Sequence, residues 1–233
     1  MATVSEDEKR VFEATPWFGA LPLPLRQRIF DESTRLELAD GDRLYARGEA
    51  ADGWYGLLSG AIKVGNLSSA GDELVLAYVE PGNWLGELSL IDGLPRSHDG
   101  HAQGATTVLR LPPARFTALM EEYPPFARAM LEMQAKRIRM MFAAIEDLNL
   151  LPLDARLAKQ LLSLAKSYGR VDGDCTEIAL HLPQEELARL LGASRQRVNR
   201  ELKAFERQGI LSARYGRLRL RNVADLERIS RRV

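Results

Sequence analysis

The sequence predicts an α+β protein with three successive parts: a strand-rich roll, one long helix, and a helix–turn–helix with a β-wing. Short extended runs broken by glycine and proline turns fill the chain up to about residue 112. A stretch of 25 residues without Gly or Pro follows at 126–150. The basic end of the chain then carries two helical segments around a glycine. We place the domain boundaries at 1–123, 124–150 and 151–233.

The composition is that of an ordinary globular protein, with 45% hydrophobic and 27% charged residues in 233. A single cysteine, Cys175, excludes a disulfide framework and a four-thiolate metal site within one chain. The longest aliphatic or aromatic run, 74–79, is far too short to span a membrane, and the acidic start does not resemble a signal peptide. We therefore expect a cytoplasmic protein with no membrane partner.

Charge is distributed unevenly, although 32 basic and 32 acidic side chains cancel overall. Residues 1–122 carry 11 Lys and Arg against 19 Asp and Glu, and residues 123–180 carry 8 against 7. Residues 181–233 carry 13 against 6, a net of +7. A basic end on an otherwise acidic chain is typical of a nucleic-acid-binding segment, with charged solvated faces as the alternative.

The first part reads as a β-sandwich or closed roll. Its predicted strands include 62–67, 74–79 and 106–111, separated by turns such as 71–72 and 81–82. A helical segment at 24–31 precedes the strands. A short helix at 114–122 lies between two pairs of prolines and ends the region.

The long helix has the apolar spacing of a coiled coil, with seam residues recurring alternately every four and every three positions. These positions are Ala127, Leu131, Gln134, Ile138, Met141, Ile145 and Leu148. We expect a homodimer whose interface contains Leu131, Ile138, Met141, Ile145 and Leu148; a helix buried in a monomer is the alternative. A second stripe, Met130, Met133, Met140 and Ala144, is expected to pack against the helix's own domain.

The last part reads as a helix at 153–168, a polar loop at 169–174, two helices at 183–191 and 194–208, and strands near 210–213 and 217–221. Gly192 permits the positive φ of a tight turn, and Ser194 suits a helix N-cap. The second helix then presents arginine and glutamine side chains, which can read guanine and adenine. The predicted DNA-binding residues are Gln184, Ser194, Arg195, Gln196, Asn199, Arg200, Arg214 and Arg217.

A candidate ligand-binding segment lies late in the roll. Gly86 and Glu87 can approach and bind a sugar hydroxyl, while Arg96 and Ser97 offer a bidentate cation and a hydroxyl to a phosphate. The alternative is an internal ion pair between Glu87 and Arg96.

The order of these parts, from about residue 18 to 221, resembles the cyclic AMP receptor protein/FNR family of bacterial transcription regulators. The resemblance rests on the 86–97 segment, the long helix, residues 153–158 and the recognition segment 192–200. It implies a jelly-roll, cyclic-nucleotide-binding-like roll, a homodimer, and a winged helix that reads an inverted repeat. It also implies an effector-responsive regulator rather than an enzyme, with cyclic AMP or cyclic GMP as effector and RNA polymerase as a further partner.

The resemblance also assigns roles in the effector site. The residue matching Glu87 binds the ribose 2′-hydroxyl, and those matching Arg96 and Ser97 bind the cyclic phosphate. The backbone of Gly86, Glu87 and Leu88 assists.

The chain departs from the family where the cyclic AMP receptor contacts adenine. Met141 and Phe142 stand in place of two hydroxyl residues, and we count both as ligand-binding. Cyclic di-GMP, another small ligand, a haem-bound gas or ligand-independent DNA binding are therefore open alternatives.

No cofactor or metal is predicted. The pair His98 and His101 lacks a full ligand set, and three histidines in the chain do not supply a cupin-type metal enzyme. The thiolates of an FNR-type iron–sulfur sensor are absent as well.

Overall fold

The computed structural model describes residues 4–67, 73–214 and 216–232. The chain divides into two compact units, the first comprising Met1–Leu67 and Leu76–Ile138, and the second Ser68–Val75 and Arg139–Val233. The division falls inside the long helix, so that helix belongs to both. Among the described residues, no helix is both long and apolar enough to cross a membrane.

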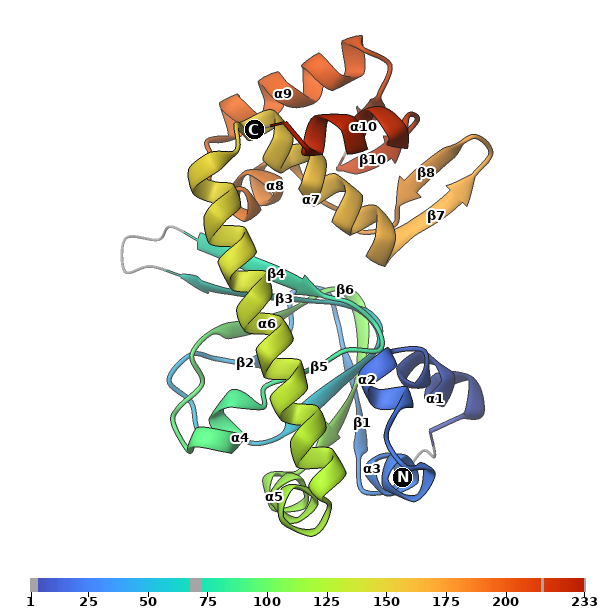
Figure 1. Ribbon diagram of the computed structural model, residues 1–233, viewed down its shortest axis with the longest axis vertical. Helices are drawn as coiled ribbons and strands as arrows, with labels where there is room; N and C mark the ends of the chain where they lie inside the picture. Colours follow the sequence, from blue (N-terminus) through green and yellow to red (C-terminus); the bar gives the residue numbers. More distant parts are fainter. Residues whose placement is uncertain (1–3, 68–72, 215, 233) are drawn as a thin grey trace. The chain divides into compact units, whose positions relative to one another are not determined.

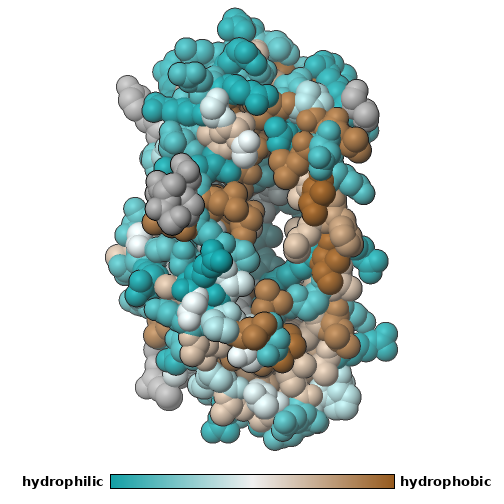
Figure 2. All heavy atoms as spheres, turned by 90° about the vertical axis from the view of Figure 1, so that its left-hand side faces the viewer, coloured by the Kyte–Doolittle hydropathy of each residue, from teal (hydrophilic) through white to brown (hydrophobic). Residues whose placement is uncertain are grey.

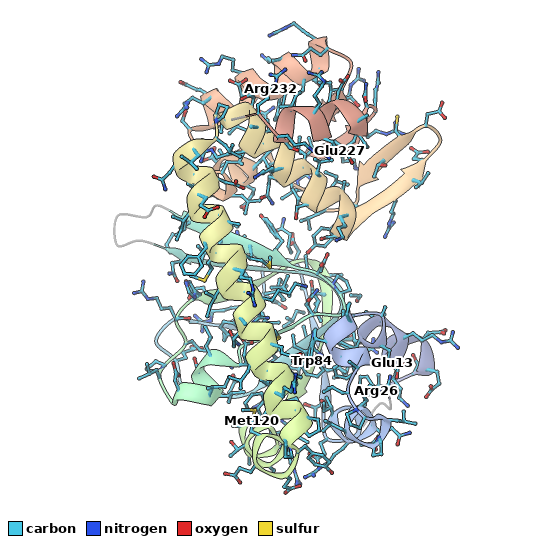
Figure 3. The ribbon with its side chains drawn as sticks, in the orientation of Figure 1. Glu13, Arg26, Trp84, Met120, Glu227 and Arg232 are labelled. Carbon is cyan, nitrogen blue, oxygen red and sulfur yellow. The ribbon has the colours of Figure 1, made fainter. Side chains whose placement is uncertain are left out.

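Three short helices open the first unit: α1 (Glu6–Glu13), α2 (Pro16–Gly19) and α3 (Leu23–Asp31). The helix predicted at 24–31 is α3, whereas α1 and α2 were not predicted. A capping box between Ser5 and Glu8 starts α1, satisfying backbone N–H groups that have no partner within the helix. Arg26 of α3 pairs with Glu13 of α1 at 2.6 Å, which fastens the two helices together (Figure 3).

The roll is an antiparallel sheet with the strand order β1-β6-β3-β4, in which β2 also pairs with β6 and β5 with β3 (Figure 1). The strands are β1 (Thr34–Leu38), β2 (Arg43–Tyr45), β3 (Trp54–Leu67), β4 (Glu73–Val79), β5 (Trp84–Leu85) and β6 (Asp99–Leu111). The predicted strands fall within β3, β4 and β6. The strand-rich first part of the α+β prediction is therefore confirmed.

An aromatic core holds the end of β5 in place. Trp84 stacks on Trp54 with ring centroids 4.1 Å apart, and Phe12 lies 5.1 Å from Trp84. Phe116 of α5 (Pro113–Glu122) contacts Trp54 from the other side. Because these rings are fully buried, they fix the chain just before the turn that leads into α4 (Leu88–Asp92).

The long helix is α6 (Pro124–Leu150). Its two prolines occupy the first turn, where a missing N–H costs no helical hydrogen bond. Phe126, Met130 and Met133 are buried in the core of the first unit, but Met140 of the same predicted stripe is 61% exposed. The expectation that this stripe packs along its whole length is therefore wrong beyond Met133, because the core of the roll does not extend further along the helix.

The five seam residues predicted for the dimer interface are exposed, whereas Ala127 and Gln134 of the same seam are half-buried. Figure 2 shows apolar side chains gathered in several areas of one face of the molecule. The exposed large apolar residues of α6 are Leu131, Ile138, Met140, Met141, Phe142, Ile145, Leu148 and Leu150.

The second unit contains α7 (Leu153–Tyr168), the helix pair α8 (Gln184–Leu190) and α9 (Arg195–Arg207), and α10 (Val223–Ser230). Its sheet has the order β7-β8-β10-β9. These strands are β7 (Gly169–Asp172), β8 (Cys175–Ile178), β9 (Leu211–Arg214) and β10 (Arg217–Leu220). The polar loop predicted at 169–174 is wrong. The segment forms the β7–β8 hairpin because β8 pairs with β10, which lies far along the sequence.

Candidate effector site and DNA interface

The Glu87 carboxylate is buried and held by α6. Gly86, with φ at +90°, turns the chain after β5, and Glu87 is only 1% exposed. Gln134 donates to its Oε1 at 2.8 Å, and Arg137 forms an ion pair with the same oxygen. Arg137 also donates to the Trp84 carbonyl at 2.5 Å. Glu87 Oε2 is buried with no hydrogen-bond partner among the described residues, so this oxygen is open to a donor from outside the chain.

Arg96 is equally buried, at 2% exposure, and is held from three directions. Its Nη1 donates to the Gly86 carbonyl at 2.5 Å, while Nη2 donates to the Gly53 carbonyl at 2.6 Å and to Asp52 at 3.1 Å. The guanidinium lies 4.6 Å above the Tyr45 ring. Its Nε is buried and unpartnered within the described part of the chain. The alternative of a Glu87–Arg96 ion pair is wrong, because each side chain pairs with another residue.

Three titratable side chains around Arg96 have shifted pKa values: Asp52, Tyr55 and Tyr45. Burial is the largest influence on the pKa of Asp52 and raises it, but hydrogen bonds from Tyr55 and Arg96 outweigh burial and lower the pKa overall. Burial, reinforced by the bond to Asp52, raises the pKa of Tyr55. Burial raises the pKa of Tyr45 to about 12. At neutral pH, Asp52 is therefore charged and both tyrosines keep their protons.

The remaining residues predicted for the effector are more exposed. Ser97 Oγ lies 2.8 Å from Nδ1 of His98, and burial and the charge of Arg47 lower the pKa of His98. Leu88, at the start of α4, is largely exposed. Met141 and Phe142 lie on the part of α6 that belongs to the second unit and are 63% and 61% exposed.

The structure adds residues that the sequence reasoning missed. Gln134 and Arg137 contact Glu87, and Asp52 and Tyr45 contact Arg96. Arg137 lies one helical turn before Met141, so the helical period offered a signal for it. Across the described ranges, no group of three or more His, Cys, Asp or Glu side chains comes together to hold a metal ion.

The helix–turn–helix forms as its sequence predicts. Gly192 adopts a φ of +58°, and the Ser194 side chain accepts a hydrogen bond from the Arg197 backbone N–H at 3.4 Å. Leu187 and Val198 are buried between the two helices. Arg156 of α7 donates to the Leu191 carbonyl at 3.1 Å, which ties the end of α8 to the helix behind it.

The side chains predicted to read bases lie on the solvent side of α9. Arg195, Gln196 and Arg200 are exposed, and Asn199 is half-buried. Arg200 pairs with Glu201 at 3.2 Å. Gln184, Arg214 and Arg217, which are also predicted to bind DNA, line one small hollow of about 40 Å³. The structure thus brings the start of α8 next to the wing strands β9 and β10.

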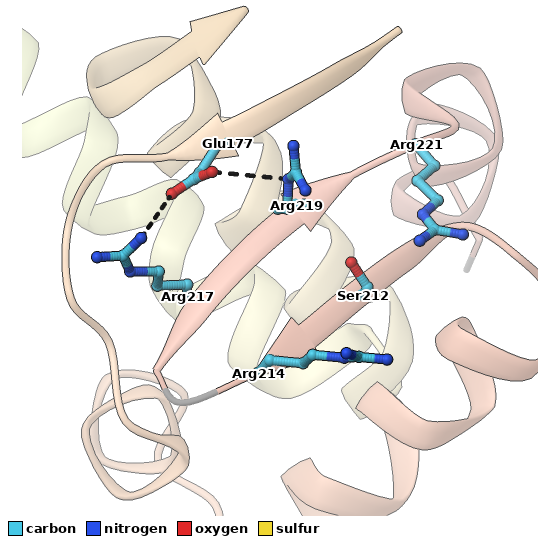
Figure 4. Close-up of a pocket in the computed structure, with 6 residues that line it drawn as sticks. All are labelled: Glu177, Ser212, Arg214, Arg217, Arg219 and Arg221. Carbon is cyan, nitrogen blue, oxygen red and sulfur yellow. Dashed lines mark ion pairs between the residues drawn. The ribbon is translucent and has the colours of Figure 1, made fainter. Parts of the chain in front are cut away.

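A larger groove opens over the sheet of this unit, with a volume of about 600 Å³ (Figure 4). Four arginines dominate its lining. The lining residues are Glu177, Ser212, Arg214, Arg217, Arg219 and Arg221.

Comparison with known proteins assigns both halves. Residues 35–123 match the family model of the cyclic nucleotide-binding domain, and residues 155–229 match that of the Crp-like helix-turn-helix domain. Over 194 residues the chain is 31% identical to the CRP-like cAMP-activated global transcriptional regulator of Mycobacterium tuberculosis (strain ATCC 25618 / H37Rv), covering 82% of this chain and 84% of that protein. It is 29% identical to the cAMP-activated global transcriptional regulator CRP of Salmonella typhimurium over 174 residues, covering 73% and 81%.

Solved structures agree. A transcriptional regulator of the CRP family from Thermus thermophilus superposes with a TM-score of 0.71 at 28% identity, covering 84% of this chain and 96% of that one. Roll, long helix and helix–turn–helix together define a ligand-responsive, DNA-binding transcriptional regulator. The chain belongs to the CRP-like family of these regulators, which confirms the resemblance, the fold class and the function predicted from the sequence.

Proposed function

We propose that this regulator responds to a cyclic mononucleotide, cyclic AMP or cyclic GMP, bound in the roll at Glu87 and Arg96. One observation carries the proposal: a buried carboxylate and a buried guanidinium each keep one polar atom without a partner in the described chain. Leaving such atoms unsatisfied costs about 1–3 kcal/mol each, so a polar ligand that reaches both is strongly favoured. The cyclic AMP-activated relatives support the same class of ligand.

Each end of the site suits a different part of the nucleotide. Glu87 Oε2 accepts a hydrogen bond from the ribose 2′-hydroxyl, since Oε1 is already occupied by Gln134 and Arg137. Arg96 Nε and the Ser97 hydroxyl donate to the cyclic phosphate, because both Nη atoms of Arg96 are engaged by the roll. The backbone of Gly86, Glu87 and Leu88 assists in binding the cyclic phosphate.

Calorimetric titration of the full chain with cyclic AMP, cyclic GMP and cyclic di-GMP tests the proposal. We expect a cyclic mononucleotide to bind, and Glu87→Gln to weaken it tenfold or more because the charged acceptor is lost. Glu37→Gln, at a glutamate whose side chain is 75% exposed on β1, is the matched control and should bind as wild type does. Binding of cyclic di-GMP alone, or equal binding to the Glu87 variant, would contradict the assignment.

The base contact is a separate proposal. Met141 and Phe142 offer apolar surface and no hydroxyl, so we propose that they stack on the base without selecting adenine over guanine. Met141→Thr should then raise the preference for cyclic AMP over cyclic GMP in the same titration. An unchanged ratio would show that position 141 does not contact the base.

We further propose a homodimer that pairs the exposed seam of α6 and reads an inverted repeat, with RNA polymerase as a partner. Half-sites one helical turn apart, roughly 34 Å, would place two α9 helices in successive major grooves. Arg195 and Arg200 are each assigned to guanine, and Gln196 to adenine. The half-site should therefore be related to the TGTGA of the family but changed at the base pair that Gln196 faces. Arg214 and Arg217 of the wing, Ser194 and Gln184 are assigned to the backbone, and Asn199 to the edge of the half-site.

A further inference from the structure

The sheet of the second unit presents a basic face that the predicted base contacts do not use. In the β9–β10 ladder, Arg217 lies opposite Arg214, and Arg219 lies opposite Ser212. Residues opposite each other in an antiparallel sheet project to the same side, and so do residues two apart on one strand. Leu218 and Leu220, which alternate with these arginines, are buried. The arginines therefore project away from the core.

Positive charge exceeds negative charge on this face. Glu177 lies 3.9 Å from Arg217 and 3.6 Å from Arg219, and Asp172 also pairs with Arg219 (Figure 4 shows the two Glu177 pairs). Within the described residues, Arg214 and Arg221 form no ion pair. Two carboxylates thus stand against the four arginines. We call Arg214, Arg217, Arg219 and Arg221 the arginine face.

The groove over the arginine face continues across the sheet. A second hollow of about 540 Å³ shares Glu177 and Arg217 with the first and runs along β7 and β8, where it adds Arg170. In the β7–β8 ladder Arg170 lies opposite Glu177, so it projects to the same side of the sheet. A basic groove thus crosses all four strands.

The spread of the cations indicates the kind of ligand. Residues two apart on a strand are separated by about 6.7 Å along the backbone, so Arg217 and Arg219 start from points that far apart, and Arg221 follows just beyond the end of β10. A row of cations along a strand exceeds what one phosphate needs, whereas a polymer that carries phosphates at regular intervals can pair with each of them. One end of the face also meets the proposed DNA interface, because Arg214 and Arg217 line the hollow that contains Gln184.

We infer that the arginine face binds the sugar–phosphate backbone of duplex DNA outside the recognised half-site. The inference rests on the proposed DNA interface of α9 and the wing, and extends it to the flanks of the operator. These contacts carry no base information, because they involve phosphates alone. They make the affinity depend on the length of DNA beyond the inverted repeat.

The test compares two duplexes with the full-length protein. Selection from a random DNA library with the wild-type protein supplies the inverted repeat. A duplex of about 20 bp covers both half-sites, and one of about 40 bp adds roughly one helical turn at each end. Fluorescence anisotropy then gives the affinity of each duplex over a range of salt concentrations. The double variant Arg219→Gln, Arg221→Gln removes two cations from the face, and Arg228→Gln, on exposed α10, is the matched control.

We expect wild type and the Arg228 control to bind the longer duplex more tightly than the shorter one. The double variant should bind the shorter duplex as wild type does and lose tenfold or more on the longer one. Its salt slope on the longer duplex should fall by about 4, one for each of the two phosphate contacts removed from each protomer of the proposed dimer. Arg221→Gln alone, at a residue with no ion pair among the described residues, should give the same pattern with a slope change of about 2, one contact from each protomer, and leaves the Arg219 pairs undisturbed.

Three results would overturn the inference. In the first, wild type binds both duplexes equally, and in the second, the variants weaken both duplexes alike. In the third, DNA affinity is unchanged while transcription in vitro falls, which would assign the face to a protein partner. Failure of the selection to recover any inverted repeat would instead refute the proposed DNA interface, so the two failures are distinguishable.

Discussion

Arg96 is predicted to stabilise the roll as well as to bind the effector, and Arg96→Ala separates this view from a purely ligand-binding role. The guanidinium donates to Asp52 and to the Gly53 and Gly86 carbonyls, and all three lose a donor in the variant. Its stacking on Tyr45 is lost too. Substitution at this position is therefore not neutral for the fold, even in the absence of nucleotide.

The magnitude follows from the burial of the pair. Breaking a buried, hydrogen-bonded charge pair by removing one partner costs about 3–5 kcal/mol. The Asp52 side chain is 50% exposed, so water recovers part of that cost and the lower end of the range applies. For a chain of this length, 1 kcal/mol lowers the melting temperature by about 2–4 °C. A loss of about 3 kcal/mol then corresponds to a drop of roughly 6–12 °C.

Tryptophan fluorescence measures this change selectively. All three tryptophans of the chain, Trp17, Trp54 and Trp84, lie in the first unit, so their signal follows the unfolding of the roll. Arg43→Ala is the matched control, because Arg43 is 60% exposed and only 3.7 Å from Glu49, a surface pair of little energetic weight. A melting temperature of Arg96→Ala within about 2 °C of this control would refute the reasoning.

The pH dependence gives a second check on the same variant. The lowered pKa of Asp52 contributes stability that is present above its unfolded value of about 3.9 and is lost as the pH falls through the folded value. Arg96 is one cause of that lowering. The difference in melting temperature between wild type and Arg96→Ala should therefore be larger at pH 7 than at pH 3. A difference that grows toward acid pH would contradict this assignment of the pair.

Three further predictions concern the other surfaces. The double variant Ile138→Asp, Ile145→Asp should sediment as a monomer, because like charges would face each other across the desolvated seam. Its DNA affinity should fall sharply as well. A double variant that stays dimeric would contradict the proposed seam. Arg200→Ala should weaken binding to the selected operator by about 1–3 kcal/mol and relax sequence preference at one base pair. A strict preference for TGTGA that persists in Gln196→Ala would show that Gln196 does not read the base assigned to it. A bound phosphate should raise the lowered pKa of His98, so cyclic nucleotide affinity should increase as the pH falls below about 6.5, and His98→Gln should remove this dependence in calorimetry.

Local patterns in the sequence were sufficient for the helices that carry function. The unbroken apolar periodicity predicted α6, and Gly192 with Ser194 placed the turn and the start of α9. Each of these signals involves residues within about one or two turns of each other. Backbone propensity and capping act over that range, so no knowledge of the tertiary structure was needed.

Pairing between distant segments was not predictable in the same way. Arg137 stands 50 residues from Glu87, and Asp52 stands 44 residues before Arg96. The helical period places Arg137 on the same face of α6 as Met141, but no sequence pattern indicates that it meets Glu87 or that Asp52 meets Arg96, because only the tertiary fold brings these residues together. The β7–β8 hairpin was missed for the same reason, because its polar, glycine-containing sequence becomes a strand pair only when β10 lies beside it.

The contacts of Glu87 connect α6 to the proposed effector site. Gln134 and Arg137 both approach Oε1, which leaves Oε2 without a partner among the described residues, so the helix orients the carboxylate that we propose receives the ribose. Ile138, the next residue, lies on the exposed seam proposed for dimer formation. A shift or rotation of α6 would therefore move both sets of contacts. If effector binding and dimer formation are coupled through α6, thermodynamic linkage makes the coupling reciprocal. The free energy by which the effector stabilises the dimer is then the free energy by which dimer formation strengthens effector binding.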